Sequence, residues 1–159
     1  MAADIFLKLG DIKGESIDEQ HRDEIELLSW SWGLAQAPAP APTGTGQRGG
    51  RATFREFNFE HHMDKASPRL MQACATGQHI PDATISERKP GSSTQDFLSV
   101  HFSDVIVTSV LPSADGEGVS EQVSLQAARV DLEYKPQRPD GSLDASIHFK
   151  FDILANRPL

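Results

Sequence analysis

The sequence predicts a mainly β protein: an antiparallel β-barrel or two-sheet sandwich with one short α-helix and a long extended loop. Three observations lead to this fold class. Apolar and polar residues alternate over most of the chain, as in half-buried strands. In two long strands the alternation changes parity, which is typical of strands that bend where a barrel turns a corner. Only one segment carries the start and stop signals of a helix.

The first 34 residues predict a strand, a polar loop and a second strand. In the first strand, Ile5, Leu7 and Leu9 alternate with polar or small neighbours, apart from Phe6. The second strand has one bulky face and one small face, formed by Leu28, Trp30, Trp32 and Leu34 on one side and by Ser29, Ser31 and Gly33 on the other. If the tryptophans fill the core, Ser29 and Ser31 face away from it.

Later strands are predicted wherever the same alternation returns: around Phe57 and Phe59, from Leu98 to Val107, from Val119 to Tyr134, and from Ile147 to Ile153. The parity changes near Asp104 and again at Ala127–Ala128, and each change predicts a bulge or bend. Asp140–Gly141 predicts a turn before the last strand.

One helix is predicted after Ala66. Ser67 is the candidate N-cap, Pro68 suits the first helical position, and Gly77 suits the left-handed position at the end. The helix has a small apolar face, formed by Leu70, Met71 and Cys74, which would cover an opening of the sheet.

Residues 35–51 predict a long loop, extended at its alternating prolines and flexible at its glycines. A loop of this length is usually functional or disordered, so it is either a contact between subunits or an untethered surface segment. Gly44–Gly49 matches the G-x-G-x-x-G pattern of nucleotide-binding loops. A proline-rich stretch precedes it and a strand-like run follows, so no nucleotide site is predicted.

Length and composition narrow the classes of function. The 159 residues suit one domain over 1–159, and a net charge of −8 argues against nucleic-acid binding. No apolar run reaches the roughly 20 residues of a membrane span, and no secretory signal peptide is recognised. A single cysteine, Cys74, excludes an internal disulfide and suits a start in the cytoplasm.

The histidines, serines and acidic residues of the sequence show no pattern that predicts a cofactor, metal or catalytic site. His61 and His62 are neighbours in a strand, so they point to opposite faces and cannot chelate one ion together. No nucleophile-elbow motif is present. The acidic clusters Asp18-Glu19, Asp23-Glu24-Glu26 and Asp115-Glu117 lack the spacing of a calcium loop and are interpreted as solvated edges or loops.

The chain resembles the haemolysin-coregulated protein (Hcp) family, which forms the inner tube of bacterial type VI secretion systems. The residues that carry this resemblance are Ile5-Phe6-Leu7-Lys8, the loop from Gly10 to Ser16, Trp30-Ser31-Trp32-Gly33, Met63 to Pro68, and Val130 to Pro136. The resemblance implies hexameric rings that stack into a tube, a contractile sheath and a spike as partners, small effector proteins in the lumen, and secretion without a cleaved signal peptide.

The resemblance also implies roles for individual residues. Ser29 and Ser31 are the candidates for the lumen face that meets cargo; the alternative is an ordinary solvent-facing strand. The candidate subunit contacts lie in the long loop, at Gln36, Pro38, Pro40, Pro42, Thr43, Gln47, Arg48 and Arg51. The competing hypothesis for the whole chain is a monomeric barrel that binds a small ligand, and an enzyme on a barrel scaffold is a third class.

Overall fold

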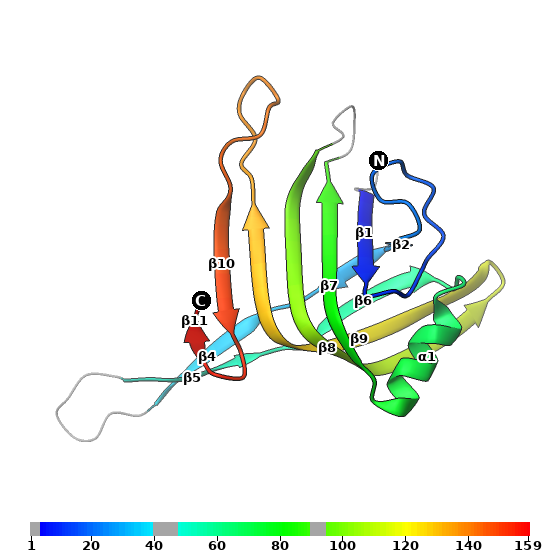
Figure 1. Cartoon of the computed structure of the whole chain (residues 1–159), viewed down its shortest axis with the longest axis horizontal. Coiled ribbons are helices and arrows are strands. Elements are labelled where there is room, and N and C mark those ends of the chain that lie inside the picture. The colour runs from blue at the N-terminus through cyan, green and yellow to red at the C-terminus, as the bar shows by residue number, and fades with distance from the viewer. Residues whose placement is uncertain (1–3, 40–47, 90–94) are drawn as a thin grey trace.

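The computed structural model describes residues 4–39, 48–89 and 95–159, and this part of the chain is built almost entirely of strands (Figure 1). The elements are β1 (Asp4–Leu9), β2 (Ile25–Glu26), β3 (Ser29–Ser31), β4 (Leu34–Ala39), β5 (Arg48–Phe54), β6 (Phe57–His62), α1 (Ser67–Thr76), β7 (His79–Arg88), β8 (Asp96–Asp115), β9 (Gly118–Tyr134), β10 (Ile147–Asp152) and β11 (Arg157–Pro158). The mainly β prediction with one short helix is confirmed.

The main sheet closes into an antiparallel barrel. β1 pairs with β7, β7 with β8, β8 with β9, β9 with β6, and β6 with β3. The segment that contains β2 and β3 completes the circle, because Leu27 N–H donates to Ile5 O at 2.9 Å and Leu28 N–H donates to Glu60 O at 2.8 Å. β10 continues the sheet from the last residues of β9, with β11 beside its far end.

The two long strands bend together. Ser103 pairs with Arg129 and Val105 with Ala127, so Asp104 lies opposite Ala128, and Asp104 has a left-handed φ of 53°. Buried residues change parity at this level in both strands, as the sequence predicts. The bend divides the sheet into a first wall, formed by β1, β7, β10 and residues 96–103 and 129–134, and a second wall, formed by β3, β6 and residues 105–127.

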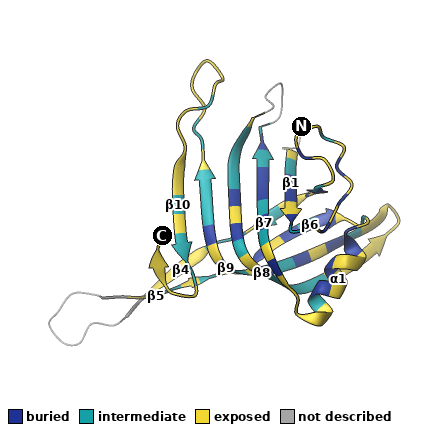
Figure 2. Ribbon diagram, viewed as in Figure 1, coloured by how far each residue is buried: buried dark blue, intermediate teal, exposed yellow. Residues whose placement is uncertain are grey.

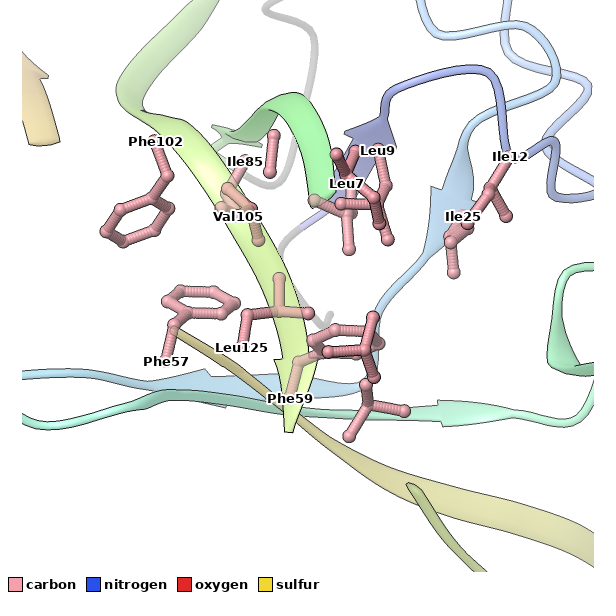
Figure 3. Packing of buried hydrophobic residues seen from close by; sticks show 14 of the residues in the cluster. Leu7, Leu9, Ile12, Ile25, Phe57, Phe59, Ile85, Phe102, Val105 and Leu125 are labelled. Atoms are coloured by element: carbon pink, nitrogen blue, oxygen red, sulfur yellow. The ribbon is translucent and has the colours of Figure 1, made fainter. Parts of the chain in front are cut away.

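The core lies between the two walls. Phe57 and Leu125 of the second wall face Phe102 and Ile85 of the first wall (Figure 3), and the Phe57 and Phe102 rings lie 5.3 Å apart, edge to face. Figure 2 shows the buried residues concentrated in β1, β6, β7 and the middle of β8 and β9. The aromatic rings bury large apolar areas and account for much of the favourable free energy of the core.

One predicted strand is interrupted. β3 ends at Ser31, and β4 begins at Leu34 and leaves the barrel, so the expected continuous strand from Leu28 to Leu34 is wrong. Leu28 and Leu34 are exposed, whereas Trp30 and Trp32 are half-buried and pack against the core. The strand is interrupted at Trp32–Gly33, and from Leu34 onward the chain no longer follows the second wall.

The C-terminal end of the helix is the one that the sequence predicts, but its N-cap is not. Gly77 has the expected left-handed φ of 65°, and Gln78 N–H donates to Ala73 O at 3.1 Å. The N-cap is Ala66 instead of Ser67, whose hydroxyl accepts the N–H of Asp64 at 3.1 Å.

The apolar face of the helix also differs from the expected one. Leu70 and Ala73 are buried, Cys74 is half-buried, and Met71 is exposed. Met71 lies one residue, and therefore about 100° around the helix, from Leu70, which turns it away from β8.

The predicted loop is largely a two-stranded ribbon. β4 and β5 pair from Leu34 opposite Phe54 to Ala39 opposite Arg48, and the pairing includes Pro38 opposite Gly49. A side chain at Gly50 would lie 2.9 Å from Ala37 O, so glycine allows the two backbones to approach. The expectation of unpaired polyproline conformation is thus wrong for residues 35–39. Residues 40–47 lie outside the described part.

Candidate functional site

Ser29 and Ser31 lie on the outward face of the second wall. Ser31 pairs with Asn58 and Ser29 with Glu60; across β6, Asn58 pairs with Ser124 and Glu60 with Gln122. Two rows of polar residues therefore cross β3, β6 and β9 side by side. Ser124 Oγ donates to Asn58 Oδ1 at 2.5 Å, which joins β9 to β6 on this face.

The rows form the floor of an open hollow of about 380 Å³. Its lining is Ser29, Trp30, Ser31, Asn58, Phe59, Glu60, Leu111, Gln122 and Ser124. Hydroxyl and amide groups dominate this lining, and Glu60 is its one charged side chain. Such a surface offers hydrogen-bond donors and acceptors in several orientations without a strong electrostatic preference for one sign of ligand charge.

The opposite face of the same strands explains why the serines point outward. Trp30 stacks on Phe57 with ring centroids 5.6 Å apart, and Phe57 and Phe59 are buried under the first wall. Side chains alternate between the faces of a strand, so burying these rings places Ser29 and Ser31 on the outside. The prediction that both serines face away from the core is confirmed.

The predicted contact residues lie on the ribbon as far as the structure describes them. Gln36 is exposed, and Pro38 and Arg48 belong to the paired strands. Pro40, Pro42, Thr43 and Gln47 lie outside the described residues.

Arg51 is engaged within its own chain, since its Nη2 donates to the carbonyl oxygens of Ile153 and Leu154 at 3.3 and 3.5 Å. Phe54 packs against Phe151, with ring centroids 5.2 Å apart. These contacts attach the base of the ribbon to the barrel.

A buried ion pair lies on the core side of the second wall, and no sequence motif predicted it. His61 Nε2 lies 2.8 Å from Glu121 Oε1, and both side chains are fully buried. Asp64 Oδ2 lies 3.8 Å from the other ring nitrogen. Burial lowers the pKa of His61, but the carboxylates of Asp64 and Glu121 outweigh it and raise the pKa above the usual value. The pair joins β6 to β9 from the core side.

A second charged cluster holds the loop between β1 and β2. Arg88 Nη2 donates to Asp18 Oδ2 at 2.5 Å and to Asp4 Oδ2 at 3.2 Å. The hydrogen bond from Arg88 holds the pKa of Asp18 below its usual range. Asp18, expected at a solvated edge or loop, lies in this loop, where Arg88 binds its partly exposed carboxylate.

His21 completes this cluster. It lies 3.1 Å from a carboxylate oxygen of Glu24 and 3.1 Å from one of Asp96, and it stacks on Phe6. Glu24 lies only three residues after His21, whereas Asp96 is 75 residues away, so the sequence spacing gave no signal for the contact with Asp96.

The described residues do not form a metal site, a phosphate-binding helix or a membrane-spanning helix. His61 is buried and His62 is exposed, as their adjacent positions in a strand predict. Within residues 4–39, 48–89 and 95–159, no group of three or more His, Cys, Asp or Glu side chains could hold a metal ion. Arg48 and Gly49 of the glycine-rich motif belong to β5, a strand, instead of the helix that a phosphate site needs. No helix in the described segments is long and apolar enough to cross a bilayer.

Comparison with known proteins points in one direction. The family model "Type VI secretion system effector, Hcp" matches residues 6–134. Protein hcp1 of Pseudomonas aeruginosa strain PAO1 is 41% identical over 160 residues, covering 98% of both chains.

Two solved structures are similar over almost their full length. The crystal structure of Hcp1 from Salmonella typhimurium has 37% identity and a TM-score of 0.80, covering 99% of this chain and 100% of that one. A structure described as a type six secretion system protein has 26% identity and a TM-score of 0.93 at the same coverage.

Proposed function

This chain belongs to the Hcp family of type VI secretion system proteins, and on that premise we propose that its second wall lines the lumen of a hexameric ring and contacts cargo there. Hcp proteins form hexameric rings, and stacked rings make the inner tube of the secretion system. The chain is a structural tube protein of a non-enzymatic family, and proteins of this family are secreted through the system.

The observation that carries the proposal is the polar hollow on the outward face of the second wall, in which Glu60 is the one charged side chain. Ser29, Ser31, Asn58 and Ser124 present small hydroxyl and amide groups to a volume of about 380 Å³. A lumen surface must admit different passengers and release them, and small neutral side chains leave room and form hydrogen bonds of modest strength. The residues with this property are concentrated on β3, β6 and β9.

The ribbon of β4 and β5 is the proposed contact with a neighbouring subunit. It projects from one end of the barrel in Figure 1, and Phe54 and Arg51 anchor its base. Of the candidate contact residues, Gln36, Pro38 and Arg48 lie along it, and Pro40, Pro42, Thr43 and Gln47 are outside the described residues. A projecting ribbon exposes backbone edges and side chains that a second copy can cover.

The remaining partners follow from the tube role. They are further copies of this chain within and between rings, the sheath and spike proteins of the apparatus, and small effectors in the lumen. We infer that the protein starts in the cytoplasm and leaves without a cleaved signal peptide, since its single cysteine suits a reducing compartment.

The alternative, a monomeric barrel that binds a small ligand, finds less support. A ligand barrel needs an interior cavity of roughly 300 Å³ or more. Here Leu7, Phe57, Phe102 and Leu125 fill the interior, and the hollow beside Trp32 and Phe102 measures about 40 Å³, room for about one water molecule.

Three measurements test the proposal. Light scattering after size exclusion should give a mass near six times 17.4 kDa, and electron microscopy should show annular particles. In cells, Ser31→Gln should leave the ring assembled but change retention of effectors, because a longer side chain fills the hollow. Ser113→Gln, on β8 outside that lining, is the control. Unchanged retention with Ser31→Gln would remove Ser31 from the cargo surface, and a strict monomer would refute the ring itself.

A further inference from the structure

The hollow on the outward face of the second wall holds one carboxylate, Glu60, and one strongly exposed leucine, Leu111. We propose that this pair selects cargo that presents a basic side chain and an apolar side chain about 10 Å apart. The carboxylate would bind the basic group, and the leucine would pack on the apolar one. This selection rests on the proposed lumen role of the second wall and names the chemistry of the cargo that is preferred there.

Glu60 has no partner within the chain to satisfy its charge. Its side chain is half-buried, and it forms no ion pair or side-chain hydrogen bond with any residue that the structure describes. Neither lysine nor arginine is among the described residues that line the hollow. An uncompensated carboxylate in such a place attracts a basic group of a partner and repels an acidic one.

Leu111 supplies the apolar contact at a fixed distance from this carboxylate. Its side chain is 61% exposed. Leu111 pairs with Gln122 and Gln122 pairs with Glu60, so the leucine and the glutamate lie in one row, two strands apart. Neighbouring strands are about 4.8 Å apart, which separates the two backbone positions by about 10 Å. A cargo segment must match this separation to use both contacts at once.

The neighbouring row of the same hollow is neutral. It consists of Ser31, Asn58 and Ser124, which pair with one another across β3, β6 and β9. Hydroxyl and amide groups donate or accept hydrogen bonds with many kinds of passenger, so this row contributes binding without selecting a sign of charge. The choice between cargoes therefore depends on the row that contains Glu60 and Leu111.

A ring would multiply the effect of the carboxylate. One Glu60 gives a single hollow little preference for the sign of a ligand's charge, but a hexameric ring would place six copies around one lumen. A cavity lined by charges of one sign concentrates groups of the opposite sign. The chain has a net charge of −8, so its overall charge adds to this field instead of cancelling it.

Three fluorescent peptides of equal length test the selection by anisotropy with wild-type rings. The first is an alanine-rich helix in which each lysine is followed by a leucine seven residues later, on the same helix face and about 10 Å away. The second has glutamate in place of lysine. The third has the composition of the first, but its leucines follow the lysines by five residues and lie on another face.

The first peptide should bind about fivefold more tightly than the other two at low salt. Its advantage over the glutamate peptide should disappear in 1 M salt, where charges are screened beyond about 3 Å.

Substitutions assign the effect to the two residues. Glu60→Gln should weaken binding of the first peptide about two- to fivefold and should not weaken binding of the glutamate peptide. Glu117→Gln removes the same charge at the exposed tip of the β8–β9 hairpin, outside the hollow, and should leave both affinities unchanged. Leu111→Ser should weaken the first two peptides alike. Its control is Leu154→Ser, because Leu154 is 72% exposed but does not line the hollow.

Four results would overturn the selection: equal binding of the three peptides to wild-type rings, an advantage of the first peptide that persists in 1 M salt, equal effects of Glu60→Gln and Glu117→Gln, or equal effects of Leu111→Ser and Leu154→Ser. Light scattering of the same samples separates this outcome from a failure of the ring. A strict monomer would refute the ring and the selection that rests on it. Rings that bind the three peptides alike would refute the selection alone.

Discussion

Replacing one partner of the buried His61–Glu121 pair should destabilise the protein far more than replacing both. Both side chains are fully buried and their nearest atoms are 2.8 Å apart. Removing one partner leaves the other as an uncompensated buried polar or charged group, which costs about 3–5 kcal/mol of unfolding free energy. Glu121→Leu and His61→Leu should each lose this amount. The double variant buries two apolar side chains instead and should lie within about 2 kcal/mol of the wild type.

Urea unfolding followed by tryptophan fluorescence measures the effect, because Trp30 and Trp32 are half-buried against the core. All variants should be compared at one protein concentration, since assembly adds to apparent stability. Glu117→Leu is the control: Glu117 is exposed at the tip of the β8–β9 hairpin and should change the free energy by no more than about 0.5 kcal/mol. A double variant that loses the sum of the two single losses would refute the reasoning, because it would mean that the pair is not coupled.

Three further outcomes are expected. The pKa of His61 is raised above its usual 6.5. The stabilisation from its charge is therefore complete below about pH 6.5 and is lost as the pH rises through the raised value. A difference in urea midpoint between wild type and His61→Leu that widens with pH would contradict this. Gly14→Ala should cost about 1–3 kcal/mol in urea unfolding, because its Cβ would lie 2.5 Å from Glu24 O. Gly33→Ala, which meets nothing within 4 Å, should be nearly neutral, and equal losses would refute the steric argument. With a net charge of −8 per chain, rings should remain single at low salt and stack more readily as salt screens their repulsion; electron micrographs of long tubes at low ionic strength would disprove it.

The sequence was informative where one face of a strand is buried. The parity changes at Asp104 and Ala127–Ala128 are visible in the sequence because the core lies on a different parity before and after the bend. The outward direction of Ser29 and Ser31 was predictable for the same reason, since Trp30 must pack inward. Gly77 was recognisable because a left-handed residue often ends a helix.

Other features left no local pattern. The ribbon of β4 and β5 has little buried surface to produce alternation, so its prolines and glycines resembled an unpaired loop. The contacts of Arg88 with Asp4 and Asp18 join residues 70 or more positions apart. Leu28 and Leu34 looked like core residues because periodicity reports which side chains share a face, and not whether another layer covers that face.

The shared bend of β8 and β9 has a mechanical consequence. Both backbones turn the corner side by side, and their hydrogen bonds continue on either side of it, from Leu98 opposite Tyr134 to Asp115 opposite Gly118. A force that pulls the two walls apart would therefore stretch continuous polypeptide instead of merely separating packed side chains. The barrel should respond to axial load as a single stiff body, with its softest parts in the ribbon and the hairpin tip that extend beyond the walls.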